Sequence, residues 1–246
     1  MRKFGLIGFP LGHSFSKKFF SEKFEYEYID ARYDLYELTN IGEFQNLRKS
    51  VELSGLNVTI PYKEQVIPLL DRLDDIAAHI GAVNVIRFDY DKNGKATLTG
   101  FNTDAVGFEN SLKPFLKPYH KKALILGTGG ASKAILYTLQ KLGIECTYVS
   151  RSVREGQLTY SDLNKEIIDN NLLIINATPL GTFPKTDVCP DIPYQFLTTR
   201  HLLFDVVYNP AETLFMKKGC DAGATALNGE EMLIGQAIAA WEIWNR

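Results

Sequence analysis

The chain has 246 residues, of which 45% are hydrophobic and 23% charged, and 27 Lys and Arg against 29 Asp and Glu give a formal net charge of -2. This composition is typical of an ordinary globular protein and excludes a disordered chain, a collagen and a coiled coil. The balanced charge also lacks the basic footprint of a nucleic-acid-binding protein, so we expect a small-molecule ligand. The length predicts one large domain or two small ones.

Three features bear on where the protein resides. Cys146, Cys189 and Cys220 are widely spaced and form no CxxC pair, which predicts reduced thiols and no metal site. The first apolar run stops at Pro10, so it predicts a strand rather than a signal peptide. The longest uncharged stretch, residues 170–184, contains Asn, Thr, Pro and Gly and is unsuited to a bilayer. We therefore expect a cytoplasmic protein without a membrane segment.

Short apolar segments alternate with helical patterns along the whole chain. This alternation predicts an α/β fold with largely parallel sheets that helices cover on both faces. The expected strands are 4–8, 26–33, 55–60, 83–88, 96–99, 123–126, 144–150, 172–176 and 202–207.

The clearest βαβ unit covers residues 121–152. A buried strand runs into the sequence GTGGAS at 127–132 and then into a helix that ends at Gly143. Glycines at such a turn let the backbone approach a pyrophosphate at the helix N-terminus. The segment predicts a dinucleotide site, with a plain tight turn as the alternative. Ser132 departs from the Gly or Ala that usually stands at the sixth position of this motif.

The end of the second strand in this unit predicts which cofactor is bound. An NAD site normally has Asp or Glu there, to accept the ribose hydroxyls, whereas this chain has Ser150, Arg151 and Ser152, followed by Arg154. Arginines can hold a ribose 2′-phosphate through charge-assisted hydrogen bonds of about 1.5–3 kcal/mol each. The pattern favours NADP over NAD and disfavours an S-adenosylmethionine site; an ordinary solvated arginine is the alternative.

Several strand and helix candidates precede Phe101, enough for a separate sheet, so a domain boundary is expected at residues 102–104. The final stretch, residues 229–246, predicts an amphipathic helix. Its apolar stripe is expected to contain Met232, Leu233, Ile238, Trp241 and Trp244. By position alone, this helix could pack on either domain.

Three loops of the first domain, at 13–16, 57–63 and 102–104, carry polar residues that a purely structural connection would not require. Strand alternation places Asn57 and Thr59 on one face. Taken singly, Ser16 or Asp104 could simply cap a helix and Lys63 could be a surface ammonium. Together they predict a ligand site at the carboxyl ends of the strands.

These motifs resemble the shikimate dehydrogenases. The matching segments, in the family's order, are GFPLGHSFS, GLNVTIPYK, GAVN, GFNTDAVG, GTGGAS, SRS, NATPLG, DVVYNPAET and GEEMLIGQA. The resemblance implies a substrate-binding and catalytic domain at 1–103 with 225–246, and a Rossmann-like NADP-binding domain at 104–224. It implies reversible, NADPH-dependent reduction of 3-dehydroshikimate to shikimate in aromatic amino-acid synthesis, by a monomer or homodimer without a metal.

The resemblance also implies roles for individual residues. Lys63 and Asp104 match the catalytic pair, and hydride addition to a ketone does create alkoxide charge that an ammonium can stabilise and protonate. The positions that match substrate contacts are Ser14, Ser16, Thr59, Lys63, Asn84, Asp104, Tyr208 and Gln236. Those that match cofactor contacts are Gly127, Gly129, Gly130, Ala131, Ser150, Arg151, Ser152, Thr178 and Gly223.

The chain departs from the family's pattern in several places. Lys17 stands where Pro is usual and Val85 where Thr is usual, while Ser150 and Ser152 replace Asn and Thr of an Asn-Arg-Thr motif. Only about twenty residues separate Ser152 from the strand that begins near residue 172. The crossover helix is therefore expected to be short or absent, and the adenosine site around Arg151 more open.

Two other functions remain open. A quinate/shikimate dehydrogenase using NAD or both cofactors would share the fold and the Lys63–Asp104 pair. A non-catalytic ligand sensor on the same fold would be expected to have lost one of these two residues, and both are present. A methyltransferase would need the ribose carboxylate that this sequence lacks.

Overall fold

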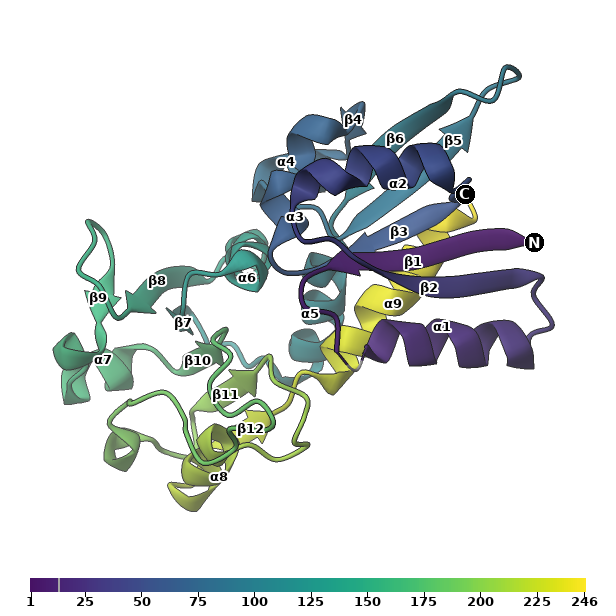
Figure 1. Ribbon diagram of the computed structural model, residues 1–246. Helices are drawn as coiled ribbons and strands as arrows, with labels where there is room; N and C mark the ends of the chain where they lie inside the picture. The colour runs from purple at the N-terminus through teal and green to yellow at the C-terminus, as the bar shows by residue number, and fades with distance from the viewer. Residues whose placement is uncertain (13) are drawn as a thin grey trace. The chain divides into compact units, whose positions relative to one another are not determined.

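The computed structural model describes residues 1–12 and 14–246, which form two compact units (Figure 1). The first unit contains Met1–Thr103 and Ala237–Arg246, and the second contains Asp104–Gln236. Each unit has a six-stranded sheet with helices on both faces, which confirms the predicted α/β class. His13, part of the first polar loop, lies outside the described residues.

The sheet of the first unit has the strand order β2-β1-β3-β5-β6-β4. β1 is parallel to β2 and β3, and β4 is parallel to β6, but β5 is antiparallel to both of its neighbours. This sheet is therefore mixed, with three parallel pairings against two antiparallel ones. Its strands are β1 (Arg2–Gly8), β2 (Ala31–Glu37), β3 (Gly55–Val58), β4 (Arg72–Leu73), β5 (Val85–Tyr90) and β6 (Ala96–Phe101).

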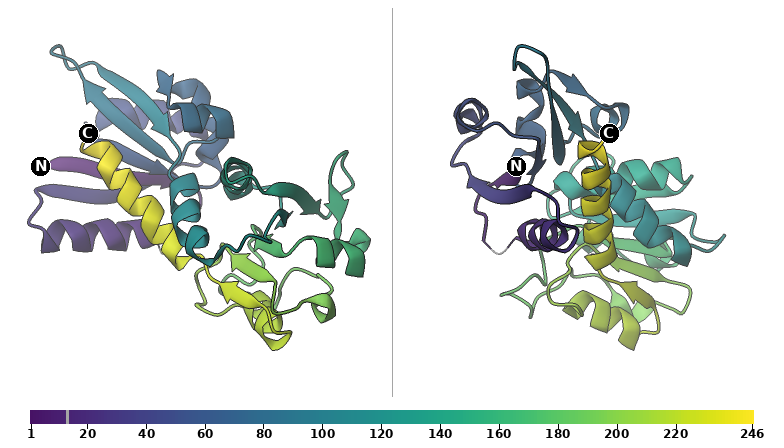
Figure 2. Two further views of the ribbon diagram at one scale, coloured as in Figure 1. Left: turned by 180° about the vertical axis from the view of Figure 1, so that it is seen from behind. Right: turned by 90° about the vertical axis from the view of Figure 1, so that its right-hand side faces the viewer.

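Alternation along β1 separates two hydrophobic layers of the first unit. Phe4 and Leu6 pack against α1 (Phe15–Tyr26) and the last part of α9 (Glu230–Trp244), which Figure 2 shows beside this sheet. Ile7 belongs to the other layer, which is covered by α2 (Phe44–Ser50), α3 (Tyr62–Gln65) and α4 (Asp75–Ile80). The period of two in a strand produces this division.

Two expectations for the first unit are wrong. The strand expected at 26–33 begins only at Ala31, because Phe20 and Phe24, one helical turn apart, are both buried and extend α1 to Tyr26. On α9, Ile238 is 48% exposed, although the amphipathic pattern placed it on the buried stripe. Ala237 and Ala240 are buried there instead, because small side chains let the helix approach the sheet.

The sheet of the second unit is wholly parallel, with the order β12-β11-β10-β7-β8-β9. Counted from β7, this is the 3-2-1-4-5-6 order of a Rossmann fold, with the order reversing between β7 and β10. Residues 225–236, expected with the first domain, lie in the second unit, because β12 pairs with β11. The strands are β7 (Lys122–Leu126), β8 (Glu145–Ser150), β9 (Leu158–Thr159), β10 (Leu173–Asn176), β11 (Leu202–Asp205) and β12 (Thr225–Leu227).

Helices cover both faces of this second sheet. α5 (Asp104–Leu112), α6 (Gly130–Lys141) and the start of α9 pack on the side of Ala123 and Ile125. α7 (Lys165–Asn170) and α8 (Leu214–Asp221) pack on the side of Leu124 and Leu126. α7 has only 6 residues, which confirms the expected short crossover.

Short 3-10 helices complete the fold, at Ile41–Glu43, Ile67–Leu69, Lys113–Phe115, Tyr160–Asp162 and Tyr194–Phe196. Across residues 1–12 and 14–246, no helix combines the length and the apolar character needed to cross a bilayer.

Candidate active site

The glycine-rich loop lies at the point where the strand order of the second unit reverses. Gly127 has a φ of +96°, and a Cβ atom there would lie 2.8 Å from Cγ2 of Thr178. Only glycine fits this combination of backbone conformation and close approach. Gly129 caps α6 without a side-chain hydrogen bond, so a bound anion can satisfy the first N–H groups of the helix.

Ser132, the residue that departs from the dinucleotide motif, fits into the fold. It is buried, and its hydroxyl donates to the carbonyl oxygen of Gly129 at 2.6 Å. The buried hydroxyl group therefore has a hydrogen-bond partner inside the turn. The serine leaves the strand-to-helix turn compact.

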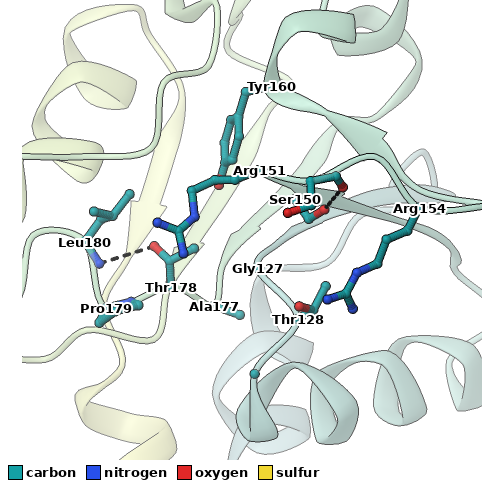
Figure 3. A pocket seen from close by; sticks show the side chains of 12 residues that line it. Gly127, Thr128, Ser150, Arg151, Arg154, Tyr160, Ala177, Thr178, Pro179 and Leu180 are labelled. Carbon is teal, nitrogen blue, oxygen red and sulfur yellow. Dashed lines mark hydrogen bonds between the residues drawn. The ribbon is translucent and has the colours of Figure 1, made fainter.

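A pocket of about 390 Å³ opens beside this loop (Figure 3). It lies at the carboxyl ends of β7, β8 and β10, which is where ligands bind in open parallel sheets. Its lining residues are Gly127, Thr128, Gly129, Ser150, Arg151, Ser152, Arg154, Tyr160, Ala177, Thr178, Pro179 and Leu180.

Two arginines dominate the charge of this pocket. Figure 3 shows Arg151 extending toward Thr178 and Arg154 extending toward Thr128. Burial raises the pKa of Tyr160, and the positive charge of Arg151 lowers it. The guanidinium group of Arg151 therefore favours the ionised form of the Tyr160 phenol. No carboxylate is among the residues that line this pocket. A cationic pocket without a carboxylate suits a phosphate better than a bare ribose diol.

Six of the nine expected cofactor residues line the pocket: Gly127, Gly129, Ser150, Arg151, Ser152 and Thr178. Gly130 and Ala131 instead form the first turn of α6, and Gly223 follows the end of α8 with a φ of +92°. Tyr160 was not anticipated, because no motif marks it and it follows an irregular crossover. Pro179 and Leu180 also received no role, although both lie in the NATPLG segment.

A buried hydrogen-bond network holds Thr178 in the pocket wall. The Asn176 Oδ1 atom accepts from the backbone N–H of Thr178 at 3.0 Å and from its hydroxyl at 2.6 Å. Asn176 in turn donates to Asp205 at 2.9 Å, and Asp205 also accepts from the Thr213 hydroxyl at 2.6 Å and from the Val207 N–H at 3.0 Å. Burial raises the pKa of Asp205 to about 6, although these hydrogen bonds oppose the rise.

The expected substrate residues of the first unit gather at one edge of its sheet. Ser14 and Ser16 follow β1, and Thr59 and Lys63 follow β3, which is parallel to β1. Asn84 precedes β5, whose antiparallel direction brings its start to the same edge. Strand direction alone therefore places three hydroxyl groups, an amide and an ammonium group at the same edge of the sheet.

Asn84 is fixed firmly at this edge. Its amide nitrogen donates to the Thr103 hydroxyl at 3.0 Å, and its Oδ1 atom accepts from the Thr103 N–H at 2.7 Å. Next to it, the Val83 N–H donates to the Lys63 carbonyl at 2.7 Å, which holds α3 close to residue 84. Lys63 and Asn84 are thus anchored to adjacent parts of the backbone.

Ser14, and not Ser16, performs the helix capping that was the plain alternative for Ser16. It is the N-cap of α1, and its hydroxyl accepts from the Lys17 N–H at 3.3 Å. Both Ser14 and Ser16 are partly exposed. Capping uses an acceptor lone pair of Ser14 and leaves its O–H donor for another partner.

The other three expected substrate residues belong to the second unit. Asp104 begins α5 and is buried, and Gln236 is buried on α9. A Cβ atom on Gly107 would lie 2.3 Å from the Met232 carbonyl oxygen, so α5 and α9 are in backbone contact and carry Asp104 and Gln236 on neighbouring helices. Tyr208 follows β11 and is 40% exposed.

The chain is similar in sequence to known proteins. Residues 6–86 match the model of the shikimate dehydrogenase substrate binding domain. The chain is 36% identical to the shikimate dehydrogenase (NADP(+)) of Methanosphaera stadtmanae, over 98% of this chain and 90% of the relative.

Solved structures are similar over nearly the full length. A shikimate 5-dehydrogenase of Thermus thermophilus in complex with NADP(H) and shikimate has a TM-score of 0.85 at 28% identity, covering 99% of this chain and 93% of that one. A quinate dehydrogenase of Corynebacterium glutamicum in complex with NAD has a TM-score of 0.85 at 26% identity, with the same coverage of 99% and 93%.

Proposed function

This chain belongs to the shikimate dehydrogenase family, as its motifs predicted, and from that membership we propose that it catalyses reversible hydride transfer between NADP(H) and shikimate. In the reductive direction, 3-dehydroshikimate, NADPH and a proton give shikimate and NADP⁺. The observation that carries the proposal is the polar edge of the first sheet, where Ser14, Ser16, Thr59, Lys63 and Asn84 gather. Hydroxyl, amide and ammonium groups suit a small polyhydroxylated carboxylate.

The second unit is proposed to bind the cofactor. The N–H groups at the start of α6 would hold the diphosphate, and Arg151 with Arg154 would hold the ribose 2′-phosphate. Gly127 and Gly129 carry no side chain, so the backbone can approach the phosphates at these two positions. NADP(H) supplies or accepts the hydride when bound.

The positions that match the family's substrate contacts are proposed to bind the substrate. Ser14 and Ser16 would donate hydrogen bonds to the carboxylate, which accepts them strongly. Thr59, Asn84, Tyr208 and Gln236 would contact the ring hydroxyls. Anchoring of the Asn84 amide by Thr103 reduces the entropy lost when the substrate binds.

Lys63 is proposed as the acid and base. As the hydride reaches the ketone carbon, negative charge develops on the oxygen, and an ammonium group stabilises that charge and then gives up a proton. In the oxidative direction Lys63 accepts the proton. Asp104 is proposed to accept a hydrogen bond from a ring hydroxyl and to pair with Lys63 in the proton transfer.

The experiment that tests this function follows nicotinamide absorbance with NADP⁺ and NAD⁺, each with shikimate and with quinate. Turnover with shikimate and NADP⁺ is expected to dominate. Turnover mainly with quinate or NAD⁺ would favour the broader quinate/shikimate enzyme, and the NAD-bound quinate dehydrogenase at a TM-score of 0.85 makes this the second candidate. Binding of shikimate and NADP⁺ without turnover would favour the sensor.

Three further points remain predictions. The first unit with the end of α9 is proposed as the substrate domain, and the second as the cofactor domain. A cytoplasmic location rests on the three separated cysteine thiols. A monomeric or homodimeric state rests on the family alone.

A further inference from the structure

Tyr160 lines the pocket of the second unit, and no motif assigns it a role. It is the first residue of the short 3-10 helix Tyr160–Asp162, directly after β9. β9 is parallel to β8, and Thr159 is paired with Ser150. Arg151 and Tyr160 are therefore the next residues along two neighbouring strands. Both leave the sheet at its carboxyl edge, where the pocket lies.

Contacts within the protein hold Tyr160 in this position. The Asp162 carboxylate accepts from the backbone N–H and from the hydroxyl of Thr159, both at 2.7 Å, which fixes the turn that begins at Tyr160. The Tyr160 side chain is half-buried and packs against the hydrophobic layer that contains Leu126 and Leu163. A side chain that is ordered in advance loses little entropy when a ligand binds.

The hydroxyl group of Tyr160 is available to a ligand. None of the residues that the structure describes forms a hydrogen bond with it, and Figure 3 shows it directed toward the Arg151 side chain. Burial raises the pKa of Tyr160 above its ordinary value, although the charge of Arg151 opposes the rise. The phenol therefore keeps its proton at neutral pH and offers an O–H donor beside a guanidinium group.

This pair of donors distinguishes the two nicotinamide cofactors. The ribose of NADP carries a 2′-phosphate, whose charged oxygens accept hydrogen bonds, whereas the ribose of NAD carries a neutral hydroxyl group at the same position. Hydrogen bonds to an ionised acceptor are roughly twice as strong as those between neutral groups. An O–H donor next to Arg151 therefore increases the preference for the phosphorylated cofactor.

We infer that Tyr160 is a specificity-determining residue for the cofactor, whose hydroxyl group donates a hydrogen bond to the ribose 2′-phosphate that Arg151 binds. This inference rests on the proposed function, because it assumes that the pocket binds the adenosine half of NADP. The residue belongs to the short crossover after Ser152, so this contact is a property of the irregular segment that precedes α7.

The test measures binding of adenosine 2′,5′-bisphosphate, the adenosine half of NADP, and of 5′-AMP, the same half of NAD, by calorimetry. Tyr160→Phe keeps the ring and removes only the hydroxyl group. Its Kd for the bisphosphate is expected to rise about tenfold or more, the effect of losing one hydrogen bond to a charged group. Its Kd for 5′-AMP is expected to change by less than about threefold, because the 2′-hydroxyl group is neutral.

Tyr194→Phe is the matched control. Tyr194 packs against the same hydrophobic layer of the second unit, and its hydroxyl donates to the Pro190 carbonyl at 2.8 Å. It is not among the residues that line the pocket. The ratio of the two Kd values in Tyr194→Phe is therefore expected to equal that of wild type.

Two results would overturn the inference while leaving the function intact. One is a Tyr160→Phe variant whose Kd changes equally for both nucleotides or for neither. The other is a Tyr160→Leu variant that weakens both nucleotides equally while Tyr160→Phe weakens neither, which would assign the ring to stacking on adenine.

A wild-type protein that binds the two nucleotides equally would overturn the proposed use of NADP, and the inference with it. Neither nucleotide contains nicotinamide, so the binding result does not depend on turnover. A failure of the proposed reaction is recognised separately, by the absence of shikimate oxidation in wild type.

Discussion

At the scale of single residues, the loop that follows β8 carries the positive charge on which the choice of cofactor is proposed to depend. Ser150 and Ser152 are joined by a hydrogen bond of 2.6 Å from the Ser150 hydroxyl to the Ser152 carbonyl, which turns the loop at Arg151. Arg151 is exposed to solvent in its side chain yet lines the pocket. The contribution of Arg151 to the free energy of cofactor binding therefore depends on its contact with a phosphate and little on packing within the protein.

Arg151→Gln is expected to raise KM for NADP⁺ by about ten- to a hundredfold, because it removes a charge-assisted contact of about 1.5–3 kcal/mol. KM for NAD⁺, which has no 2′-phosphate, should change little. Steady-state kinetics with both cofactors measure this. Lys165→Gln removes an equal charge from the same crossover outside the pocket and serves as the control; a parallel loss with both cofactors would refute the assignment.

Lys63→Ala is expected to lower kcat by about a hundredfold or more, because the ammonium is assigned to charge that develops only in the transition state. Shikimate binding, measured by calorimetry, should change only a few-fold. Lys49→Ala, at an exposed position on α2, is the control. Near-normal turnover of Lys63→Ala would remove Lys63 from the acid–base role.

At the scale of elements, the ends of β10 and β11 are joined by a carboxylate that the sequence motifs did not assign. Asp205 receives hydrogen bonds from Asn176, Val207 and Thr213, so it ties both strand ends to the start of α8. Through Asn176 it also fixes the backbone of Thr178. The wall of the cofactor pocket therefore depends on how three elements meet.

The raised pKa of Asp205, about 6 against an ordinary 3.8, predicts a pH-dependent stability. Between these values the folded state binds more protons than the unfolded state, so the free energy of unfolding falls as pH rises. The shift of about two units corresponds to about 3 kcal/mol. This contribution is complete below pH about 4 and is lost as pH rises through about 6.

Asp205→Asn removes this titration. The unfolding free energy of wild type minus that of the variant, measured in urea from pH 4 to pH 7, is expected to fall by about 3 kcal/mol. Asp221→Asn, at the exposed end of α8, serves as the control for an added amide. A difference that stays constant with pH would show that Asp205 has an ordinary pKa.

At the scale of the whole molecule, the chain ends in the unit where it begins. The last ten residues, Ala237–Arg246, complete the hydrophobic layer formed by Phe4 and Phe20. Trp244 is 4% exposed, its ring lies 4.8 Å from that of Phe4, and its Nε1 atom donates to the Ile86 carbonyl at 3.0 Å. The first unit is therefore built from two segments that are far apart in the sequence.

Trp244→Ala is expected to destabilise the first unit by about 3–5 kcal/mol, the usual cost of emptying a large buried site. Native-state hydrogen exchange should show lost protection in β1 and β3 and retained protection in β7 and β10. Ile238→Ala, 48% exposed on the same helix, is the control. Equal loss in both sheets would mean that the two units unfold together.

The α/β class, the βαβ unit at 121–152, the glycine loop and the family could all be predicted from the amino-acid sequence. These features depend on patterns within a few residues, such as a period of two in a strand, a glycine at a tight turn or a short motif. The short crossover after Ser152 could likewise be counted along the chain. Such local patterns also located most of the residues that line the cofactor pocket.

Which distant segments meet could not be predicted from the sequence and is known from the three-dimensional fold. The direction of β5 brings Asn84 to the edge where β1 and β3 end, and the three-residue strand β12 keeps residues 225–236 in the second unit. Tyr160 lies in no motif, and Asp205 begins a motif that assigned it no role; the parts they play come from partners far along the chain or across a loop. Strand register, direction and long-range packing depend on the sum of many weak contacts, which no single stretch of sequence contains.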